Sequence, residues 1–370
     1  MLIGIDASRC ARARRTGTEN YCRQIIRALL DLDPVNRYRL YYNRPAAAGP
    51  SALAPRAETR VLPSPYLWTH ARLGWEVLRR PPDVLFVPAH VVPLYCRPPA
   101  VVTIHDLGYL RFPEAHRPAA RLYLRLSTAH SARAARRVIA VSAATKADLV
   151  TTLGIPAEKV AVVPEACPPG FAPLSDREAG RAVARRYGLD GPYLISLGTL
   201  HPRKNLVRLL EAFALARREA RLPHRLALVG QVGFRGEEVV AAIGRLGLGD
   251  AVALTGYVPA AELPLLLGAA DALAFPSLHE GFGLPVLEAM ACDVPVLAAN
   301  TSSLPEVVGN AGLLVDPLDV PGMALALGRL LTDAALRADL VARGRQRVGA
   351  YTWERAARET LAVLASACQS

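Results

Sequence analysis

The chain has 370 residues, 52% of them hydrophobic, and this predicts two globular domains with sizeable apolar cores. No apolar run reaches the ~18 residues that a membrane-spanning helix needs. The amino-terminal segment enters a strand directly and has no basic leader, so no signal peptide is expected. The six cysteines are scattered and form no CxxC pair, which indicates reduced thiols in the cytoplasm rather than a disulfide framework or a zinc site.

The positive charge is unevenly distributed. Residues 1–165 contain 24 Lys and Arg against 12 Asp and Glu, whereas residues 166–370 contain 20 against 20, so the whole formal excess of +12 lies in the first half. A basic half suits nucleic acid, anionic lipid headgroups or an anionic substrate. Because 41 of the 44 cations are arginines, compositional bias explains the excess equally well. The arginines are dispersed and no nucleic-acid-reading motif accompanies them, so no nucleic-acid partner is expected.

In the first half, apolar runs alternate with segments of helical period, which predicts a parallel sheet with helices between its strands. The expected strands are 2–6, 37–42, 59–62, 83–88, 100–104, 138–141 and 160–164. The expected helices are 19–32, 66–80, 117–137 and 142–153. Because helix 66–80 holds Trp68 and Trp75 among arginines, it is either an amphipathic helix that touches lipid or, as we favour, an ordinary helix that packs its aromatic rings on the sheet.

Two places in the first half are positioned for ligands. Gly17 and Thr18 lie at the mouth of the first helix, where a backbone N–H can meet a phosphate. His105 and Asp106 follow the strand 100–104, and in open α/β sheets ligands bind beyond the carboxyl ends of strands. A histidine there can donate to a sugar hydroxyl or stabilise developing charge. The alternative is a structural His–Asp turn.

One acidic pair, Asp31 and Asp33, has the spacing of a metal-binding DxD motif. It stands at the end of a predicted helix, before Pro34 and away from any strand. We therefore interpret it as a helix-terminating surface loop rather than a metal site.

A proline-rich linker at 167–173 coincides with the change in charge balance, and we place a domain boundary there, between 168 and 169. In the second half, the expected strands are 193–197, 225–229, 251–254, 271–275, 294–298 and 312–315. The expected helices are 206–219 and 262–270, one that begins near Pro285, and a mostly helical stretch over 323–367. Beyond strand 251–254 lies a short segment against which a nucleotide base would lie, namely Gly256, Tyr257 and Val258.

A pair of cations follows the first strand of the second half. The strand ends in Gly198 and Thr199, and Arg203 and Lys204 come just before helix 206–219. An arginine can clamp phosphate oxygens in a fork and a lysine adds a point charge. Their position after a buried strand therefore favours an anion site over solvated surface.

The stretch PSLHEGFGLPVLE, residues 276–288, reads as a strand end, a glycine loop and a helix start. The loop amides and the helix dipole direct positive charge to one place, which predicts an anion cradle. Glu280 and Glu288 bracket that cradle. Carboxylates repel phosphate but accept hydrogen bonds from hydroxyl groups. The pattern therefore suits a ligand with phosphates in the middle and polyhydroxyl rings at both ends, as in a nucleotide sugar.

With these pieces together, the chain resembles the retaining nucleotide-sugar glycosyltransferases of family 4, which have the GT-B fold. The pair Glu280 and Glu288 with EGFGLP between them is the most specific part of the resemblance. Glu19 is a departure, because similar proteins often carry glycine or another small residue there. The matching motifs run in family order across nearly the whole chain: TGTENY (16–21), TIHDL (103–107), AVSAATKADL (140–149), GTLHPRKN (198–205), LTGYV (254–258) and HEGFGLPVLEAMACDVPVLAAN (279–300).

This resemblance implies an α/β protein of two Rossmann-like domains that face a central cleft. Residues 1–168 would bind the acceptor and 169–352 the nucleotide sugar, and the C-terminal helix, 353–370, often crosses back onto the first domain in such folds. The resemblance implies four catalytic residues: His105, Glu280, Arg203 and Lys204. His105 and Asp106 would lie on the acceptor side. The implied donor-binding set is Gly17, Thr18, Gly198, Thr199, Arg203, Lys204, Gly256, Tyr257, Val258, Glu280, Gly281, Phe282, Gly283, Leu284 and Glu288.

The expected activity is transfer of a hexose to an acceptor hydroxyl with retention, in which the Arg–Lys pair takes the place of a metal ion and no cofactor is needed. GDP-mannose is the favoured donor, with UDP-glucose and UDP-N-acetylglucosamine open. A glycan or glycolipid of the cell envelope is the favoured acceptor, with a soluble metabolite as the alternative. The protein would work in the cytoplasm or at the inner face of the membrane, through its basic first domain. Two further readings are a nucleotide-sugar epimerase or hydrolase of the same fold and a non-catalytic nucleotide-sugar-binding protein.

Overall fold

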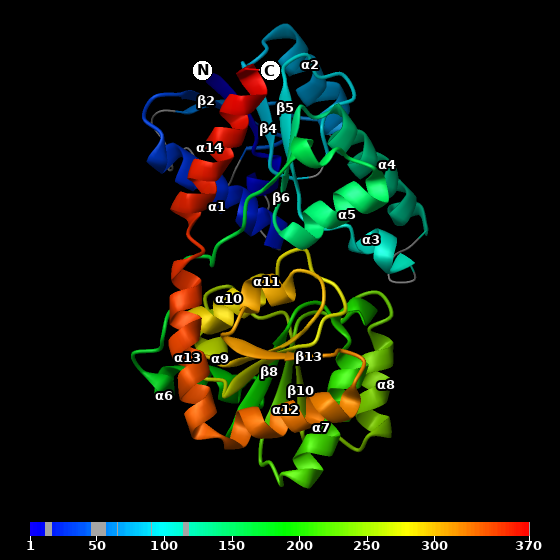
Figure 1. Cartoon of the computed structure of the whole chain (residues 1–370), viewed down its shortest axis with the longest axis vertical. Coiled ribbons are helices and arrows are strands. Elements are labelled where there is room, and N and C mark those ends of the chain that lie inside the picture. Colours follow the sequence, from blue (N-terminus) through cyan, green and yellow to red (C-terminus); the bar gives the residue numbers. More distant parts are fainter. Residues whose placement is uncertain (12–16, 46–56, 65, 90, 114–117, 370) are drawn as a thin grey trace. The chain divides into compact units, whose positions relative to one another are not determined.

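A computed structural model describes residues 1–370 apart from 12–16, 46–56, 65, 90, 114–117 and 370. Arg12, Arg14, Arg15 and Thr16, which stand between the predicted strand 2–6 and the predicted helix 19–32, lie outside the described residues. The chain forms two compact units (Figure 1). Unit 1 gathers Met1–Arg111, Arg117–Ala166 and Tyr351–Ser370, and unit 2 gathers Phe112–His116 and Cys167–Ala350.

Unit 1 contains a seven-stranded parallel sheet in the order β3-β2-β1-β4-β5-β6-β7. Its strands are β1 (Leu2–Asp6), β2 (Arg37–Tyr42), β3 (Ala57–Val61), β4 (Val84–Val87), β5 (Ala100–Ile104), β6 (Arg137–Ala140) and β7 (Val160–Val162). Its α-helices are α1 (Gly17–Leu32), α2 (Gly74–Arg79), α3 (Gly108–Arg111), α4 (Pro118–Ala134), α5 (Ala143–Leu153) and α14 (Trp353–Gln369). Separate apolar clusters cover the two faces of the sheet, one under α1 and α14 and the other under α2, α4 and α5 (Figure 1).

Unit 2 contains a six-stranded parallel sheet in the order β10-β9-β8-β11-β12-β13. Its strands are β8 (Tyr193–Leu197), β9 (Arg225–Val229), β10 (Val252–Gly256), β11 (Ala272–Phe275), β12 (Val296–Ala299) and β13 (Gly312–Val315). Its α-helices are α6 (Arg177–Arg186), α7 (Leu206–Glu219), α8 (Glu237–Arg245), α9 (Leu263–Gly268), α10 (Leu284–Ala291), α11 (Leu304–Val308), α12 (Val320–Thr332) and α13 (Ala334–Gly349). Two parallel sheets in an α/β chain agree with the fold class predicted from the sequence.

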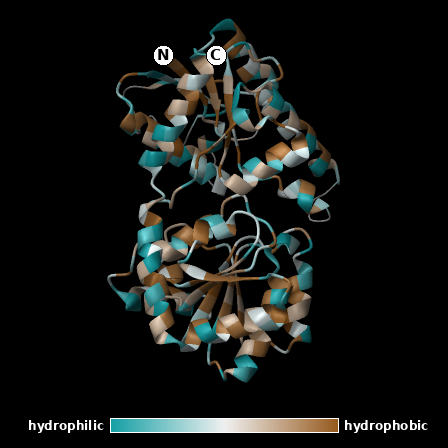
Figure 2. Cartoon of the chain, in the orientation of Figure 1, coloured by the Kyte–Doolittle hydropathy of each residue, from teal (hydrophilic) through white to brown (hydrophobic). Residues whose placement is uncertain are grey.

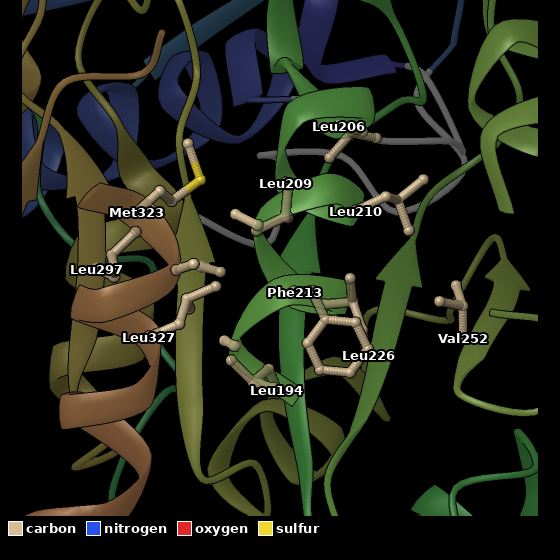
Figure 3. Close-up of a cluster of buried hydrophobic side chains, with 14 of the residues drawn as sticks. Leu194, Leu206, Leu209, Leu210, Phe213, Leu226, Val252, Leu297, Met323 and Leu327 are labelled. Carbon is tan, nitrogen blue, oxygen red and sulfur yellow. The ribbon is translucent and has the colours of Figure 1, made fainter. Parts of the chain in front are cut away.

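The core of unit 2 lies between its sheet and the pair α7 and α12. Phe213 and Leu209 of α7 and Leu327 of α12 are fully buried there, against apolar side chains of the central strands (Figure 3). In Figure 2 the inner strands are mostly hydrophobic, whereas the helices carry hydrophobic and hydrophilic residues side by side. Strands covered on both faces have no polar side to present to water, so they appear in sequence as continuous apolar runs.

The expected helix 66–80 is one continuous helical segment that runs from 68 to 79, and its first part is π-helical. A π-helical turn over Thr69–Leu73 is followed by α2, and Gly74 stands at the junction. Trp68 is buried and its indole N–H donates to the Leu62 carbonyl at 2.7 Å, whereas Trp75 is 55% exposed. The preferred packing of both tryptophans on the sheet is therefore correct for the first and wrong for the second.

Other boundaries also differ from expectation. The helix expected over 117–137 ends at Ala134, because Arg137 already begins β6 and pairs with β5. The helical stretch expected over 323–367 is three helices, and Asp333 separates α12 from α13 by accepting a hydrogen bond from the Leu336 amide. The helices α6, α8 and α11 were not predicted at all.

The C-terminal helix α14 belongs to unit 1, where it packs against α1 (Figure 1, red beside blue). Ala356, Ala357 and Leu364 on one face of α14 are buried in the same apolar cluster as Ile25 and Ile26 of α1. The end of the chain is therefore part of the core of the first unit.

Gly230, which follows β9, tests how closely the strand ends pack. A Cβ there would lie 2.1 Å from the Gly198 carbonyl oxygen, and its φ of +149° suits only glycine. We expect Gly230→Ala to destabilise unit 2 by at least about 2 kcal/mol, measured as faster hydrogen exchange of β8 and β9. Gly244→Ala is the matched control, because open space surrounds that helical glycine and alanine should stabilise α8 by up to about 1 kcal/mol. Equal protection in both variants would contradict this account.

Candidate active site

The cations Arg203 and Lys204 lie beyond the carboxyl end of β8, as predicted, but not in the helix that follows. They occupy a separate 3-10 turn, Pro202–Lys204, and Asn205, with φ of +58°, divides this turn from α7. The Asn205 side chain donates to the Pro317 carbonyl at 2.7 Å, which holds the turn in place. The cations therefore sit on a rigid turn of their own at the edge of the sheet.

Glu280 is the partner of both cations. Its Oε1 lies 2.6 Å from Lys204 Nζ and its Oε2 lies 3.0 Å from Arg203 Nη1. Burial alone would raise the pKa of this carboxyl, but the charges of Arg203 and Lys204 outweigh burial and lower the pKa to about 2. Glu280 is therefore ionised at neutral pH although it is only 9% exposed. Lys204 Nζ also lies 4.5 Å from the centre of the Phe275 ring, a cation–π contact.

Two serines that follow β12 fix the loop that carries Glu280. Ser302 Oγ accepts from the Glu280 amide at 2.9 Å, and Ser303 Oγ contacts the carbonyl oxygens of Glu280 at 3.0 Å and Phe282 at 2.8 Å. The Leu278 amide donates to the Arg203 carbonyl at 2.9 Å. The loops after β8, β11 and β12 are thus tied together. Neither serine was among the predicted site residues, although their position after a buried strand was a usable signal.

Helix α10 begins at the glycine loop and has no side-chain cap. Its N-cap is Gly283, with φ of +108°, and a Cβ there would lie 2.8 Å from Leu304 Cδ2, so glycine is required for both reasons. The helix starts at Leu284, with Pro285 second. Such a helix start presents backbone amides and the positive end of the dipole, the combination that binds anions. Gly281 and Phe282 are buried in the same loop.

The remaining predicted donor residues of unit 2 lie in α10 and at the ends of β8 and β10. Glu288 is half-buried one turn into α10, and its charge adds to burial in raising the pKa of the Cys167 thiol. Gly256 is the last residue of β10 rather than a residue beyond it, Tyr257 is 51% exposed and Val258 is buried. At the end of β8, Gly198 is half-buried and Thr199 is exposed.

His105 lies at the carboxyl end of β5 in unit 1 and is buried. Its Nδ1 lies 2.8 Å from Glu165 Oε1 and its Nε2 lies 2.9 Å from the Pro88 carbonyl oxygen. A carbonyl oxygen can only accept hydrogen bonds, so Nε2 carries a proton and donates to Pro88, and a protonated Nδ1 donates to the Glu165 side chain. The edge of His105 meets Tyr21 at a centroid distance of 4.7 Å. Asp106, half-buried beside it, accepts from the Gly108 amide.

The charge of His105 depends on Glu165. Burial by itself lowers the pKa of His105, but the hydrogen bond and charge of Glu165 reverse this and raise the pKa above its ordinary value near 6.5. Glu165 follows β7 and was not among the predicted site residues, because nothing local in the sequence connects it with a histidine 60 positions earlier. In this geometry His105 reaches a sugar hydroxyl only if it gives up the Pro88 carbonyl.

The start of α1 differs from a simple phosphate site. Gly17 is exposed and Thr18 half-buried, but Glu19 in the first turn is only 4% exposed and lies 3.5 Å from Arg9 Nη1. The positive end of the α1 dipole therefore already acts on a carboxylate of its own chain.

The acidic pair near the end of α1 has the structural role that was inferred for it. Asp33 accepts hydrogen bonds from the Tyr38 hydroxyl, the Asn36 side chain and the Val35 amide, and Asp31 is exposed and lies 3.5 Å from Arg27. Within the described ranges of the chain, no cluster of three or more His, Cys, Asp and Glu is arranged to hold a metal ion.

The amino-acid sequence of the chain matches a known class of enzymes. Residues 15–169 match Glycosyltransferase Family 4 and residues 184–347 match Glycosyl transferases group 1. The O-antigen chain mannosyltransferase B of Escherichia coli is 35% identical over 263 residues, which cover 71% of this chain and 69% of that one. The chain belongs to the family 4, group 1 glycosyltransferases and is a glycosyltransferase of GT-B fold.

Two further similarities bear on the fold and the ligand. A GDP-mannose-dependent alpha-(1-6)-phosphatidylinositol monomannoside mannosyltransferase of Mycolicibacterium smegmatis is 38% identical over 197 residues, which cover 49% of this chain and 50% of that one. The structure of Alr3699/HepE from Anabaena in complex with UDP and glucose superimposes with a TM-score of 0.75 at 21% identity and covers 99% of both chains.

Replacement of Glu165 by glutamine tests the His105 pair. Without the carboxylate charge, burial is the dominant influence and the pKa of His105 should fall below about 6.5. The folded-state pKa is raised in the native protein, so the pair adds stability that is complete below about pH 6.5 and is lost as the pH rises through that folded pKa. NMR titration of histidine-labelled protein measures this pKa directly. Glu178→Gln, an exposed change in unit 2, is the control, and an unchanged His105 titration in Glu165→Gln would contradict the assignment.

Proposed function

We propose that the protein transfers mannose from GDP-mannose to a hydroxyl group of a cell-envelope glycan or glycolipid, with retention of anomeric configuration and without a metal ion. The observation that supports it most is the ion cluster of half-buried Arg203 and Lys204 with buried Glu280, beside the uncapped start of α10. Family membership makes the reaction a glycosyl transfer, and the cluster indicates how it is catalysed.

The diphosphate of the donor would bind between the cations and the helix start. An ammonium carries three N–H donors and a guanidinium five, so Arg203 and Lys204 have the capacity to hold Glu280 and phosphate oxygens at once. Glu280 and Glu288 would accept hydrogen bonds from hydroxyl groups, Glu280 from the transferred sugar and Glu288 from the ribose. The Gly283 and Leu284 amides would lie against the phosphates and the sugar.

Catalysis would rest on preorganised positive charge in the donor site. As the glycosidic bond to the nucleotide breaks, negative charge grows on the β-phosphate, and fixed cations in a water-poor site lower the energy of that state. The role usually given to a divalent ion would fall to Arg203 and Lys204. The acceptor hydroxyl would attack from the face that the phosphate leaves, and the departing phosphate would take its proton, so the configuration is retained.

The choice of donor rests on relatives. O-antigen chain mannosyltransferase B and the GDP-mannose-dependent mycobacterial enzyme both bear the name of mannosyltransferase. The Anabaena structure was solved with UDP and glucose, so a UDP-sugar is the donor to test against GDP-mannose.

Contact with a membrane surface is part of the proposal. Among the described residues, no helix is both long enough and apolar enough to cross a bilayer. On unit 1, the exposed side chains include Trp75, with Arg79 stacked 5.5 Å from its ring, and Leu122 and Tyr123 on α4. Aromatic and aliphatic side chains beside arginines suit the interface of an anionic membrane, where a lipid-linked acceptor would be presented at the cytoplasmic face.

Substitution of the cations tests the catalytic assignment. Arg203→Gln and Lys204→Gln should each lower kcat about 100-fold, which corresponds to about 3 kcal/mol in the barrier, while the thermal unfolding midpoint of the protein shows that unit 2 still folds. Arg218→Gln, an exposed change on α7, is the matched control. Loss of less than about threefold in either site variant would refute the electrostatic role.

The activity itself is tested with purified protein, GDP-mannose or UDP-glucose, and mannose-terminated glycan acceptors. We expect transfer from GDP-mannose that persists in excess EDTA, and a product whose anomeric configuration by NMR equals that of the donor. An inverted product would overturn retention, EDTA-sensitive transfer would overturn metal independence, and transfer only from UDP-glucose would overturn the choice of donor.

A further inference from the structure

A cavity of about 840 Å³ lies in unit 1 at the edge of the sheet where β5 and β6 begin. The loops before β5, β6 and β7 and the last turn of α14 form its walls. Its lining holds five cationic side chains and one carboxylate, Glu158, a formal excess of four positive charges. We call it the cation cavity, and its cations are Arg97, Arg133, Arg136, Arg137 and Lys159.

Backbone carbonyls hold three of these cations in position. Arg133 Nη2 donates to the Leu153 carbonyl at 3.3 Å, Arg137 Nη1 to the Glu158 carbonyl at 2.9 Å, and Lys159 Nζ to the Arg133 carbonyl at 2.6 Å. A carbonyl fixes a cation without neutralising its charge. In the part of the chain that the structure describes, no carboxylate lies within 4.0 Å of any of the five. Burial lowers the pKa of Lys159, so holding it charged there has a cost.

The negative C-terminal ends of nearby helices offset only part of the positive charge in the cation cavity. In an α/β unit the helices run opposite to the strands, so helix C-termini gather where strands begin. Three of them lie at the cation cavity: α4 and α14 contribute lining residues, and the last carbonyl of α5 accepts from Arg133. Each C-terminus carries about half a negative charge, roughly −1.5 in all. The side chains exceed this by roughly two and a half positive charges.

We propose that the cation cavity binds a ligand that carries two phosphate groups, at a site distinct from the donor site of unit 2. Two phosphates together bring about −3 to −4 at neutral pH, which offsets the formal excess of four side-chain charges, whereas one phosphate offsets only about half of it. Arginine forks hold phosphate oxygens in pairs. Arg97 and Arg136 are exposed and reach in from two different loops.

This chemistry has two sources, a soluble phosphorylated compound and the headgroup of an anionic lipid. The lipid source has a structural argument of its own. Leu94 and Tyr95 directly precede the cavity loop and are 57% and 73% exposed, and an aliphatic and an aromatic side chain beside an arginine suit a membrane interface. The binding site does not depend on the transfer reaction, so it stands or falls separately from the proposed function.

Calorimetric titration with inorganic pyrophosphate tests the soluble source. We expect two binding events in the full-length protein. Arg97→Gln with Arg136→Gln should weaken one of them at least tenfold, and Lys204→Gln should weaken the other. Both arginines are exposed, so the double change should not disturb the fold, and Lys159→Gln provides a second, single variant. Arg245→Gln with Arg358→Gln removes the same charge from exposed arginines that face carboxylates, and should leave both events unchanged.

Co-sedimentation with phosphatidylcholine vesicles, with and without cardiolipin, an anionic lipid that carries two phosphate groups, tests the lipid source. If the ligand is a headgroup, binding to the anionic vesicles should fall at least fivefold in Arg97→Gln with Arg136→Gln and not in the control pair. A loss confined to one arm supports the proposal and identifies the source. If the cavity variants match the control pair in both arms, the proposal is wrong.

Discussion

The site of unit 2 depends on one buried carboxylate. An ionised carboxyl group out of water is costly unless it is paired, and Glu280 meets that condition by giving one oxygen to Arg203 and the other to Lys204. Both cations come from the turn that follows β8, whereas Glu280 comes from the loop that follows β11. The ion cluster therefore holds the strand-end loops together, and the same cations are kept where a diphosphate would arrive. Loss of either cation should affect both structure and catalysis, but catalysis more, because the other cation still pairs with Glu280.

Unit 1 also holds a buried carboxylate beside a basic side chain, but here the basic side chain is a histidine. The histidine is His105 and the buried carboxylate is Glu165, and both again follow strands at the carboxyl edge of a sheet. The two pairs differ in whether one of their members changes charge near neutral pH. The pKa of Glu280 is lowered to about 2, so its charge is constant at physiological pH, whereas a histidine changes charge near neutrality unless its partner prevents it. Glu165 therefore determines whether this edge of unit 1 is positive.

The sequence predicted what local patterns encode. The strands 2–6, 100–104, 193–197, 225–229 and 312–315 are confirmed to the residue, because buried parallel strands are largely apolar runs bounded by turns. Strand 37–42 is confirmed as well, although two arginines interrupt its apolar residues. Lys204 and Glu280 are 76 positions apart, yet each follows a strand, and that shared topology places them at one edge. Glu165, Ser302 and Ser303 escaped because their roles arise from pairing across the fold. The π-helical turn at Thr69–Leu73 escaped because it is a single turn inside a longer helix, and an apolar pattern of helical period continues on both sides of it.

The two edges of a parallel α/β sheet differ electrostatically, and this explains why the cations of the protein are handled in two ways. Helix N-termini gather at the carboxyl edge and make it positive, so cations added there need carboxylates, and Arg203 and Lys204 share Glu280. Helix C-termini gather at the amino edge and make it negative, so cations can be held there by carbonyls alone, as in the cation cavity. Part of the excess charge of the first half is thereby concentrated at one edge of unit 1. Compositional bias toward arginine supplies the residues, but the direction of the strands decides which of them remain available to an anion.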